Sequence, residues 1–164
     1  MNTIKTIGQP VAAAQYVERP TVKVIIKKGD TILLLNDGLL PGGGVDEGEA
    51  YLDAIRRELA EELGATARDV MELGTVIQYR NFLSKKYLVH GYSAILATEG
   101  GERSPQDEGE ANFVQHWLSV EEAIAYVEES IRAAQAKPTD DDRSQGKLYN
   151  LMTTYELLKR LDSV

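Results

Sequence analysis

The sequence predicts an α/β fold in which helices are layered on a mixed β-sheet. Segments with the β-branched, aliphatic composition of strands lie on both sides of a segment whose apolar residues recur at helical spacing. Hairpin-like turns join the strand segments, and two further helical segments follow them. The 164 residues suit one domain, so we expect a single domain over residues 1–164.

The composition excludes several classes of function. The chain has no cysteine, which excludes disulfides, thiolate zinc sites and a cysteine nucleophile. Its 18 basic and 26 acidic residues give a formal net charge of −8, so neither duplex nucleic acid nor an anionic membrane surface is an expected partner. No apolar run approaches the ~18 residues of a transmembrane helix, and the N-terminus is a poor match to a signal peptide. We therefore expect a cytoplasmic protein.

Two strands are predicted in the first 35 residues. Residues 21–27 (TVKVIIK) and 31–35 (TILLL) are rich in β-branched and aliphatic residues, and the KGD sequence between them predicts a hairpin turn. Residues 1–18 show no clear periodicity and are expected to form a loose N-terminal arm or an edge strand. This arm and Tyr16 could serve a homodimer.

Residues 47–63 are predicted to form a helix. Their apolar residues recur with a period of about 3.6 and form one stripe that is expected to face the sheet, namely Leu52, Ile55, Leu59 and Leu63. Gly64 stands where a helix C-cap glycine belongs. Glu49 is expected in the first turn, where a carboxylate favours the helix dipole.

Three more strand segments and a long loop are predicted after this helix. The strand-like segments are residues 70–79, 87–98 and 113–118. Residues 99–111 are rich in Gly, Glu, Pro and Asp, and we expect them to form a loop.

The chain is predicted to close with two helices. Ser119 and Glu122 form a capping-box pattern, which predicts a helix that runs to about residue 136. A C-terminal helix is expected within residues 143–162. Its apolar face is predicted to consist of Leu148, Leu151, Tyr155 and Leu158.

Three carboxylates share one flank of the helix predicted at residues 47–63. On a helical wheel Glu58, Glu61 and Glu62 fall beside the apolar stripe, and Arg57 is placed to pair with Glu61. Carboxylates packed in this way repel one another and raise one another's pKa unless a cation neutralises them. Mg²⁺ does this well, because it prefers oxygen ligands and usually keeps substrate phosphates in its shell. The glycines of residues 42–44 leave the backbone free to approach a metal ion or a phosphate.

A charge run on a helix is usually a solvated face, but the spacing here is more constrained. The pattern of residues 43–65 resembles the signature of the Nudix hydrolases position by position. The matching residues are Gly43, Glu49, Arg57, Glu58, Leu59, Glu61, Glu62 and Gly64. The one departure is Ala65, where the family favours a larger aliphatic residue, and this affects packing rather than chemistry. The order of the predicted segments over residues 20–130 is also similar to that fold.

The resemblance implies a Nudix-like α/β/α sandwich around a mixed β-sheet. It implies metal-dependent hydrolysis of a diphosphate linkage in a nucleoside diphosphate derivative, a small molecule, with Mg²⁺ or Mn²⁺ as the cofactor. Glu58, Glu61 and Glu62 would be the metal-binding carboxylates, and the backbone of Gly43 could add a ligand. Arg57, together with Glu49, would hold the loop and the helix in register.

The mechanism that this chemistry favours is direct in-line attack by water, which needs no Ser, Cys or His nucleophile. A glutamate of the cluster could take the proton of that water. The sequence leaves open whether this base is Glu58, Glu61, Glu62 or an acid from a distant loop. It also leaves open the number of metal ions.

One further carboxylate outside the helix is expected to complete the site, because a metal-bound diphosphate needs more anionic ligands than one helix flank provides. Residues 104–111 (SPQDEGEA) contain Asp107, Glu108 and Glu110. We prefer Glu110 as a catalytic and metal-binding residue, since it lies nearest the following strand, and place Glu108 second. All three could instead be ordinary surface acids.

Candidate substrate contacts are Tyr79, Arg80 and Lys85, which gather aromatic and basic groups in one hairpin of an acidic protein. An edge hairpin protected by lysines explains them equally well. Among substrates we favour a nucleoside triphosphate or a nucleotide sugar, although no further motif selects one.

Two other classes of function compete with the hydrolase. The first is a non-catalytic Nudix-like sensor that binds a nucleotide ligand and reports it to a partner. Loss of a carboxylate from the motif would favour the sensor, and none is lost here. The second is an acidic cation-binding interaction protein, which would bind metal without turnover of any nucleotide.

Overall fold

Six strands form one mixed sheet in the computed structural model, which describes residues 1–162. The strands are β1 (Thr3–Ile7), β2 (Val17–Lys28), β3 (Thr31–Leu35), β4 (Thr66–Arg80), β5 (Lys85–Thr98) and β6 (Gln115–Leu118). Their order across the sheet is β1-β4-β5-β2-β3-β6. The pairs β1–β4 and β2–β5 are parallel, and the other three are antiparallel.

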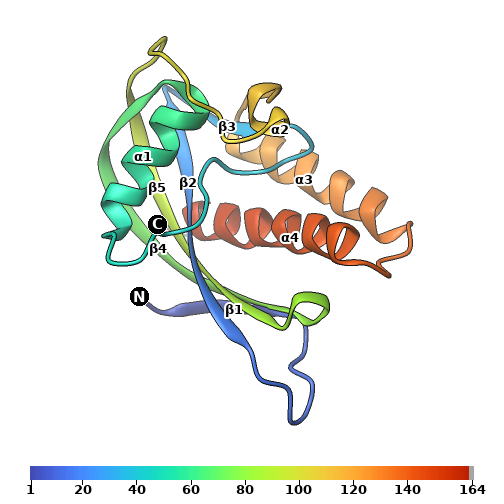
Figure 1. Cartoon of the computed structure of the whole chain (residues 1–164). Coiled ribbons are helices and arrows are strands. Elements are labelled where there is room, and N and C mark those ends of the chain that lie inside the picture. The colour runs from blue at the N-terminus through green and yellow to red at the C-terminus, as the bar shows by residue number, and fades with distance from the viewer. Residues whose placement is uncertain (163–164) are drawn as a thin grey trace.

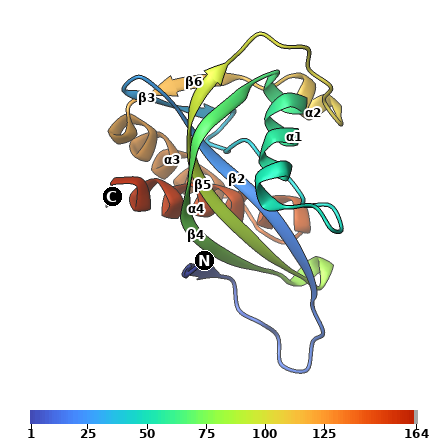
Figure 2. The ribbon, with the colours of Figure 1, turned by 90° about the vertical axis from the view of Figure 1, so that its left-hand side faces the viewer.

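Helices cover both faces of this sheet. They are α1 (Tyr51–Leu63), the short α2 (Glu108–Ala111), α3 (Val120–Gln135) and α4 (Asp142–Asp162). Figures 1 and 2 show α1 on one face and α3 and α4 on the other. The prediction of an α/β/α sandwich around a mixed sheet is confirmed. Among the described helices, none combines the length and apolar character that crossing a membrane requires.

The hydrophobic core consists of two clusters, one on each face of the sheet, and the central strand β2 contributes to both. Val24 and Ile26 of this strand pack on the α1 side with Ile55 and Leu59. Ile25 packs on the opposite side, in the cluster to which α3 and α4 contribute. Successive side chains of a strand point to opposite faces, so a strand buried on both faces reads as a continuous aliphatic run. This is why the segment VKVII predicts a strand so clearly.

The strands at residues 21–27 and 31–35 are confirmed as parts of one antiparallel hairpin. The N-terminal arm contains an edge strand, because β1 pairs with β4. Strand β4 begins at Thr66, before the predicted start at residue 70. Its first half carries irregularities in register with β5, and Asp69 has a φ of 53°, so the alternation typical of a strand is broken there.

Helix α1 begins at Tyr51, and the prediction that it begins at residue 47 is wrong. Gly48 has a φ of 78°, and the residues before Tyr51 form a loop, so Glu49 is not in the first helical turn. Leu52 is 45% exposed and does not belong to the buried stripe. The C-cap at Gly64 is confirmed, with a φ of 60°. A Cβ at Gly64 would lie 2.1 Å from the carbonyl oxygen of Gly101, so the position requires glycine.

The C-terminal half differs from the prediction in two details. Residues 99–111 are not loop throughout, because Asp107 caps the short helix α2 by accepting a hydrogen bond from the Glu110 N–H. The capping box of α3 is confirmed, and α4 begins at Asp142. The face of α4 that packs inward is wider than predicted, since Leu157 is fully buried as well.

Candidate active site

Arg57 joins α1 to the loop that precedes it. Its Nε donates to Glu49 Oε1 at 2.8 Å, and its Nη2 donates to Glu49 Oε2 at 2.9 Å and to the Gly44 carbonyl at 2.9 Å. The hydrogen bond from Arg57, with one from the Asp46 N–H, lowers the pKa of Glu49 to about 2. The pKa of Arg57 is raised by the same contact. Glu49 is therefore an ionised anchor for the loop.

The remaining nitrogen of Arg57 faces two carboxylates of the helix. Nη1 lies 2.9 Å from Glu58 Oε1 and 3.4 Å from Glu61 Oε2. The ion pair with Glu61 that the helical wheel predicts is thus present. Glu58 is 6% exposed, and its burial raises its pKa although Arg57 opposes the shift. One guanidinium consequently fixes the loop, Glu58 and Glu61 relative to one another.

Glu62 is the most buried of the three carboxylates, with 4% exposure. Burial raises its pKa to about 7, and the charges of Glu58 and Glu110 add to the shift. One of its oxygens accepts a hydrogen bond from the Gly42 N–H at 2.9 Å. Neither this bond nor the nearby Lys23 offsets the burial. The site therefore holds more negative charge than its own cations neutralise.

The glycines before the helix allow the loop to lie directly against β2 and the carboxylates. A Cβ at Gly42 would lie 2.1 Å from the Val22 carbonyl oxygen, and a Cβ at Gly43 would lie 2.4 Å from Glu58 Oε1. The Gly43 carbonyl accepts a hydrogen bond from the Val22 N–H at 3.0 Å. This carbonyl keeps a second lone pair that could bind a cation. A side chain at either position would displace the loop from the glutamates.

Lys23 is a functional candidate that sequence reasoning missed. Its Nζ donates to the carbonyls of Leu40 and Gly42 at 3.0 and 2.6 Å. Its charge lowers the pKa values of both Glu58 and Glu62, against the larger effect of burial. A lysine in the middle of a strand that is otherwise buried was the available signal.

Glu110 is partly buried, whereas Glu108 is exposed. The charge of Glu110 raises the pKa of Glu62. Its Oε2 accepts a hydrogen bond from the Gln106 N–H at 2.6 Å. The same loop is attached to the end of α1, because the Ser104 N–H donates to the Glu61 carbonyl at 3.1 Å. The loop that carries Glu110 is thus joined to the end of α1.

The acidic residues fit a divalent cation by their chemistry. Within residues 1–162, no group of three Asp, Glu or His side chains is preassembled around a metal position. Arg57 instead contacts two of the carboxylates. The donors are all carboxylate oxygens, which suit a hard cation. Burial raises the pKa values of Glu58 and Glu62, so a bound cation would stabilise their ionised forms.

The three candidate substrate residues lie at the far end of the β4–β5 hairpin. Arg80 is 7% exposed, donates to Asp142 Oδ1 at 2.9 Å and lies 5.1 Å from the ring centroid of Tyr87. Its contacts hold the start of α4 against β4. Tyr79 packs its ring edge-on against Tyr16 at 5.1 Å.

Lys85 pairs with Val17, whereas the Gly44 bridge to β2 is at Thr21. Four residues of strand correspond to about 13 Å. The hairpin end is therefore separated along β2 from the glycine loop.

A model of the NUDIX domain matches residues 17–141, which include the loop, α1 and α2. An RNA pyrophosphohydrolase of Psychrobacter sp. (strain PRwf-1) is 48% identical over 54 residues, which are 31% of this chain and 30% of that protein. The match thus spans less than a third of that relative's length.

Solved structures share the fold. A MutT NUDIX hydrolase from Burkholderia pseudomallei aligns with a TM-score of 0.53 and 23% identity, covering 64% of this chain and 85% of the other. A NUDIX hydrolase from Nitrosomonas europaea aligns with a TM-score of 0.54 and 22% identity, covering 81% and 89%. Arg57 and the carboxylates that it contacts lie within residues 17–141, the part of the chain that the family model matches. The chain belongs to the NUDIX domain family.

Proposed function

We propose that this protein hydrolyses a diphosphate linkage in a nucleoside diphosphate derivative, using Mg²⁺ or Mn²⁺. The observation that carries the proposal is the pair of buried glutamates, Glu58 and Glu62, whose pKa values are raised beside a glycine loop fixed by Arg57. Such a site attracts a hard cation and leaves backbone groups free for phosphate oxygens. Membership of the NUDIX family supports the same class of reaction.

The proposed roles follow from the contacts. Glu58, Glu61, Glu62 and Glu110 would hold the cation, with the Gly43 carbonyl as a further ligand. Arg57 positions Glu58 and Glu61 by contacting both. A divalent cation held there would supply the positive charge that stabilises the charge developing on the diphosphate in the reaction.

Proton removal from the attacking water is assigned to a carboxylate of this cluster. A base works best when its pKa lies near the working pH, and the pKa of Glu62 is about 7 without a cation. A bound cation would lower that value, so Glu58, Glu61 and Glu110 remain alternatives for the base.

The substrate that we favour is a nucleoside triphosphate or a nucleotide sugar. The similarity to an RNA pyrophosphohydrolase adds RNA as a further candidate. We also propose that β1 and α4 belong to the same domain as residues 17–141, because β1 pairs with β4 and Leu157 of α4 packs in the shared core. Association into a homodimer stays a prediction that sedimentation can test.

A panel of substrates tests the proposal. Nucleoside triphosphates, nucleotide sugars and a 5′-triphosphorylated RNA oligomer are incubated with Mg²⁺, with Mn²⁺ or with EDTA, and the products are resolved by ³¹P NMR. We expect cation-dependent cleavage of at least one class. Glu61→Gln should reduce the rate on the order of 10²–10³-fold, whereas Glu121→Gln on α3 should not.

The same panel separates the competing functions. Saturable binding of a nucleotide without any cleavage would support the sensor. Binding of the cation with neither nucleotide binding nor cleavage would support an acidic interaction protein. Either result would overturn the hydrolase.

A further inference from the structure

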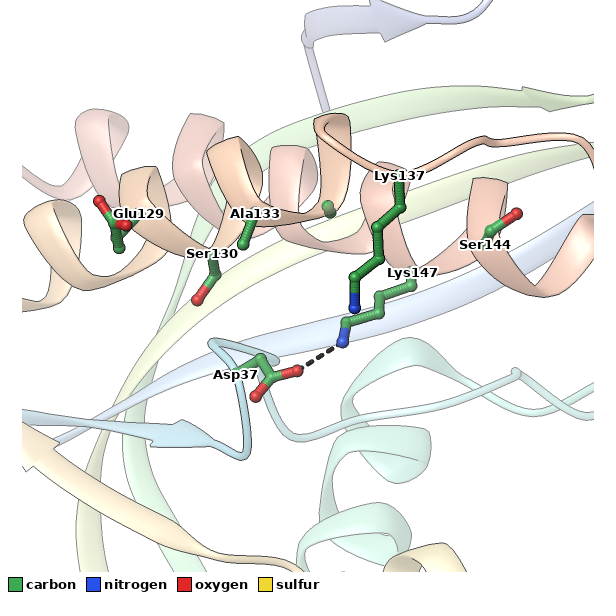
Figure 3. A pocket seen from close by; sticks show the side chains of 8 residues that line it. Asp37, Glu129, Ser130, Ala133, Lys137, Ser144 and Lys147 are labelled. Atoms are coloured by element: carbon green, nitrogen blue, oxygen red, sulfur yellow. Dashed lines mark ion pairs between the residues drawn. The ribbon is translucent and has the colours of Figure 1, made fainter.

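A cavity of about 320 Å³ lies between α3, α4 and the turn that follows β3 (Figure 3). Asp37 lines it from the turn, Ser130 from α3, Lys137 from the segment after α3, and Ser144 and Lys147 from α4. None of the glutamates proposed to bind the cation belongs to its lining. The cavity is therefore separate from the carboxylate site, although the turn leads directly into the glycine loop.

The wall that carries Asp37 is held in place by both helices. The Tyr126 hydroxyl donates to the Asn36 carbonyl at 2.9 Å. Gly38 has a φ of 120°, and a Cβ there would lie 2.9 Å from Val127 Cγ2 and 3.4 Å from Leu151 Cδ2. The turn is therefore packed against both α3 and α4.

The charges inside the cavity leave one cation without a counter-charge. Lys147 Nζ lies 2.6 Å from Asp37 Oδ2. Glu129 also lines the cavity but pairs with Arg132 at 2.9 Å, and both side chains are largely exposed. Among the side chains that the structure describes, no ion pair involves Lys137. Figure 3 shows both lysine side chains pointing toward the turn that carries Asp37.

We propose that this cavity binds a phosphate group. Lys137 supplies an ammonium group that no ion pair among the described side chains engages, Lys147 supplies one that it shares with Asp37, and Ser130 supplies a hydroxyl. Lysine is a common phosphate ligand. A phosphate dianion competes with Asp37 for Lys147 and at the same time supplies a partner for Lys137. Two lysines and two acids, Asp37 and Glu129, line the cavity, so binding depends on the ammonium of Lys137 rather than on a general excess of positive charge.

Because phosphate and Asp37 would compete for Lys147, changes at Lys137 and at Asp37 should alter phosphate binding in opposite directions. The full chain, labelled with ¹⁵N and kept in EDTA, is titrated with inorganic phosphate and, separately, with AMP. We expect amide shifts at Asp37, Ser130, Lys137 and Ser144. Lys137→Gln should weaken binding at least about tenfold, the size of one lost charge-assisted hydrogen bond. Asp37→Asn should strengthen binding, because it frees Lys147.

A matched control removes the same charge elsewhere. Lys27→Gln lies on β2, outside the lining of the cavity, and should leave the affinity unchanged. Tighter binding of AMP than of inorganic phosphate identifies a phosphate carried by a nucleotide, and equal affinities identify the free ion. Equal weakening by Lys27→Gln and Lys137→Gln, weaker binding in Asp37→Asn, or shifts confined to the glycine loop would each overturn the proposal. EDTA keeps this result independent of the cation-dependent hydrolysis.

Discussion

Arg57 and Glu49 form a two-point ion pair in which Nε and Nη2 of the arginine each donate to one oxygen of the glutamate, at 2.8 and 2.9 Å. Such planar, two-bond pairing fixes orientation as well as distance. The same guanidinium contacts Glu58 and Glu61. The position of the glycine loop is therefore coupled to the orientation of two candidate metal ligands.

Arg57→Lys should reduce activity strongly, although it keeps the positive charge. An ammonium keeps the charge but cannot make two parallel hydrogen bonds to Glu49 while it contacts Glu58. Small misplacements of groups in an active site can cost about 100-fold in rate. We expect a loss of this order in kcat at saturating Mg²⁺, measured with the substrate that the panel identifies.

Arg56→Lys is the matched control for that change. Arg56 is the preceding residue of α1, and it pairs with Asp53 on the exposed side of the helix. Its variant should keep the wild-type rate. Equal rates in the two variants would contradict the positioning role of Arg57.

Glu62 should make the cation-free protein less stable as the pH rises. Its pKa is raised from 4.5 to about 7 in the folded chain. Between these values the folded state binds more protons than the unfolded state, so the free energy of unfolding falls with rising pH. The contribution of this group is at most on the order of 3 kcal/mol. Glu49 acts in the opposite direction, since its pKa of about 2 means that its stabilisation is lost as the pH falls below 4.5.

The measurement is urea unfolding in EDTA at pH 5 and pH 8. Glu62→Gln should have a smaller difference in unfolding free energy between the two pH values than the wild type, and should be more stable than the wild type at pH 8. Glu121→Gln, on the exposed face of α3, is the control. If the difference in unfolding free energy between pH 5 and pH 8 is the same in Glu62→Gln as in the wild type, burial does not raise the pKa of the Glu62 carboxyl.

Local chemistry made much of the fold predictable. The capping box of Ser119 and Glu122 and the left-handed cap at Gly64 depend on residues within one helical turn, and both are present in the structure. The spacing of the acidic motif likewise predicted that Arg57 and Glu61 would pair. Features set by neighbouring residues could therefore be inferred without a structure.

Features that depend on distant contacts could not be inferred in this way. Lys23 gains its importance from a loop almost twenty residues later, whose carbonyls at Leu40 and Gly42 fold back to it. In the sequence Arg80 resembles an exposed basic residue, but in the structure it is buried and pairs with Asp142 of α4. Glu49 was expected in the first turn of the helix, but it lies in the loop before α1. Its pairing with Arg57 agrees with what the family resemblance implied, so only its place in the loop could not be inferred.

Mg²⁺ should raise the melting temperature, because a ligand that binds only the folded state stabilises it by mass action. At a concentration 100 times the dissociation constant this amounts to about 2.7 kcal/mol. Replacing Glu58 and Glu62 together by Gln should weaken the response and stabilise the cation-free protein, since it removes two buried charges. Thermal unfolding with Mg²⁺ and with EDTA measures both effects. An unchanged shift in the double variant would place the cation elsewhere.

Glu110→Gln should lower the maximal rate more than it lowers substrate affinity. The carboxylate of Glu110 is close enough to raise the pKa of Glu62, and its loop is joined to α1 through Ser104 and Glu61. We therefore expect it to position the cation and water from outside the helix, which favours the transition state over the bound substrate. Initial rates over a range of substrate concentrations at saturating Mg²⁺ separate the two parameters.

Glu108→Gln is the control for this last change, since Glu108 belongs to the same short helix but is exposed. The two variants remove the same charge from the same loop, so general electrostatic effects cancel between them. A loss of kcat in Glu110→Gln alone would support Glu110 as the outer acid. The reverse pattern would move that role to Glu108, because a mobile exposed carboxylate could turn inward when the cation binds. Wild-type rates in both variants would mean that the glutamates of α1 complete the site without this loop.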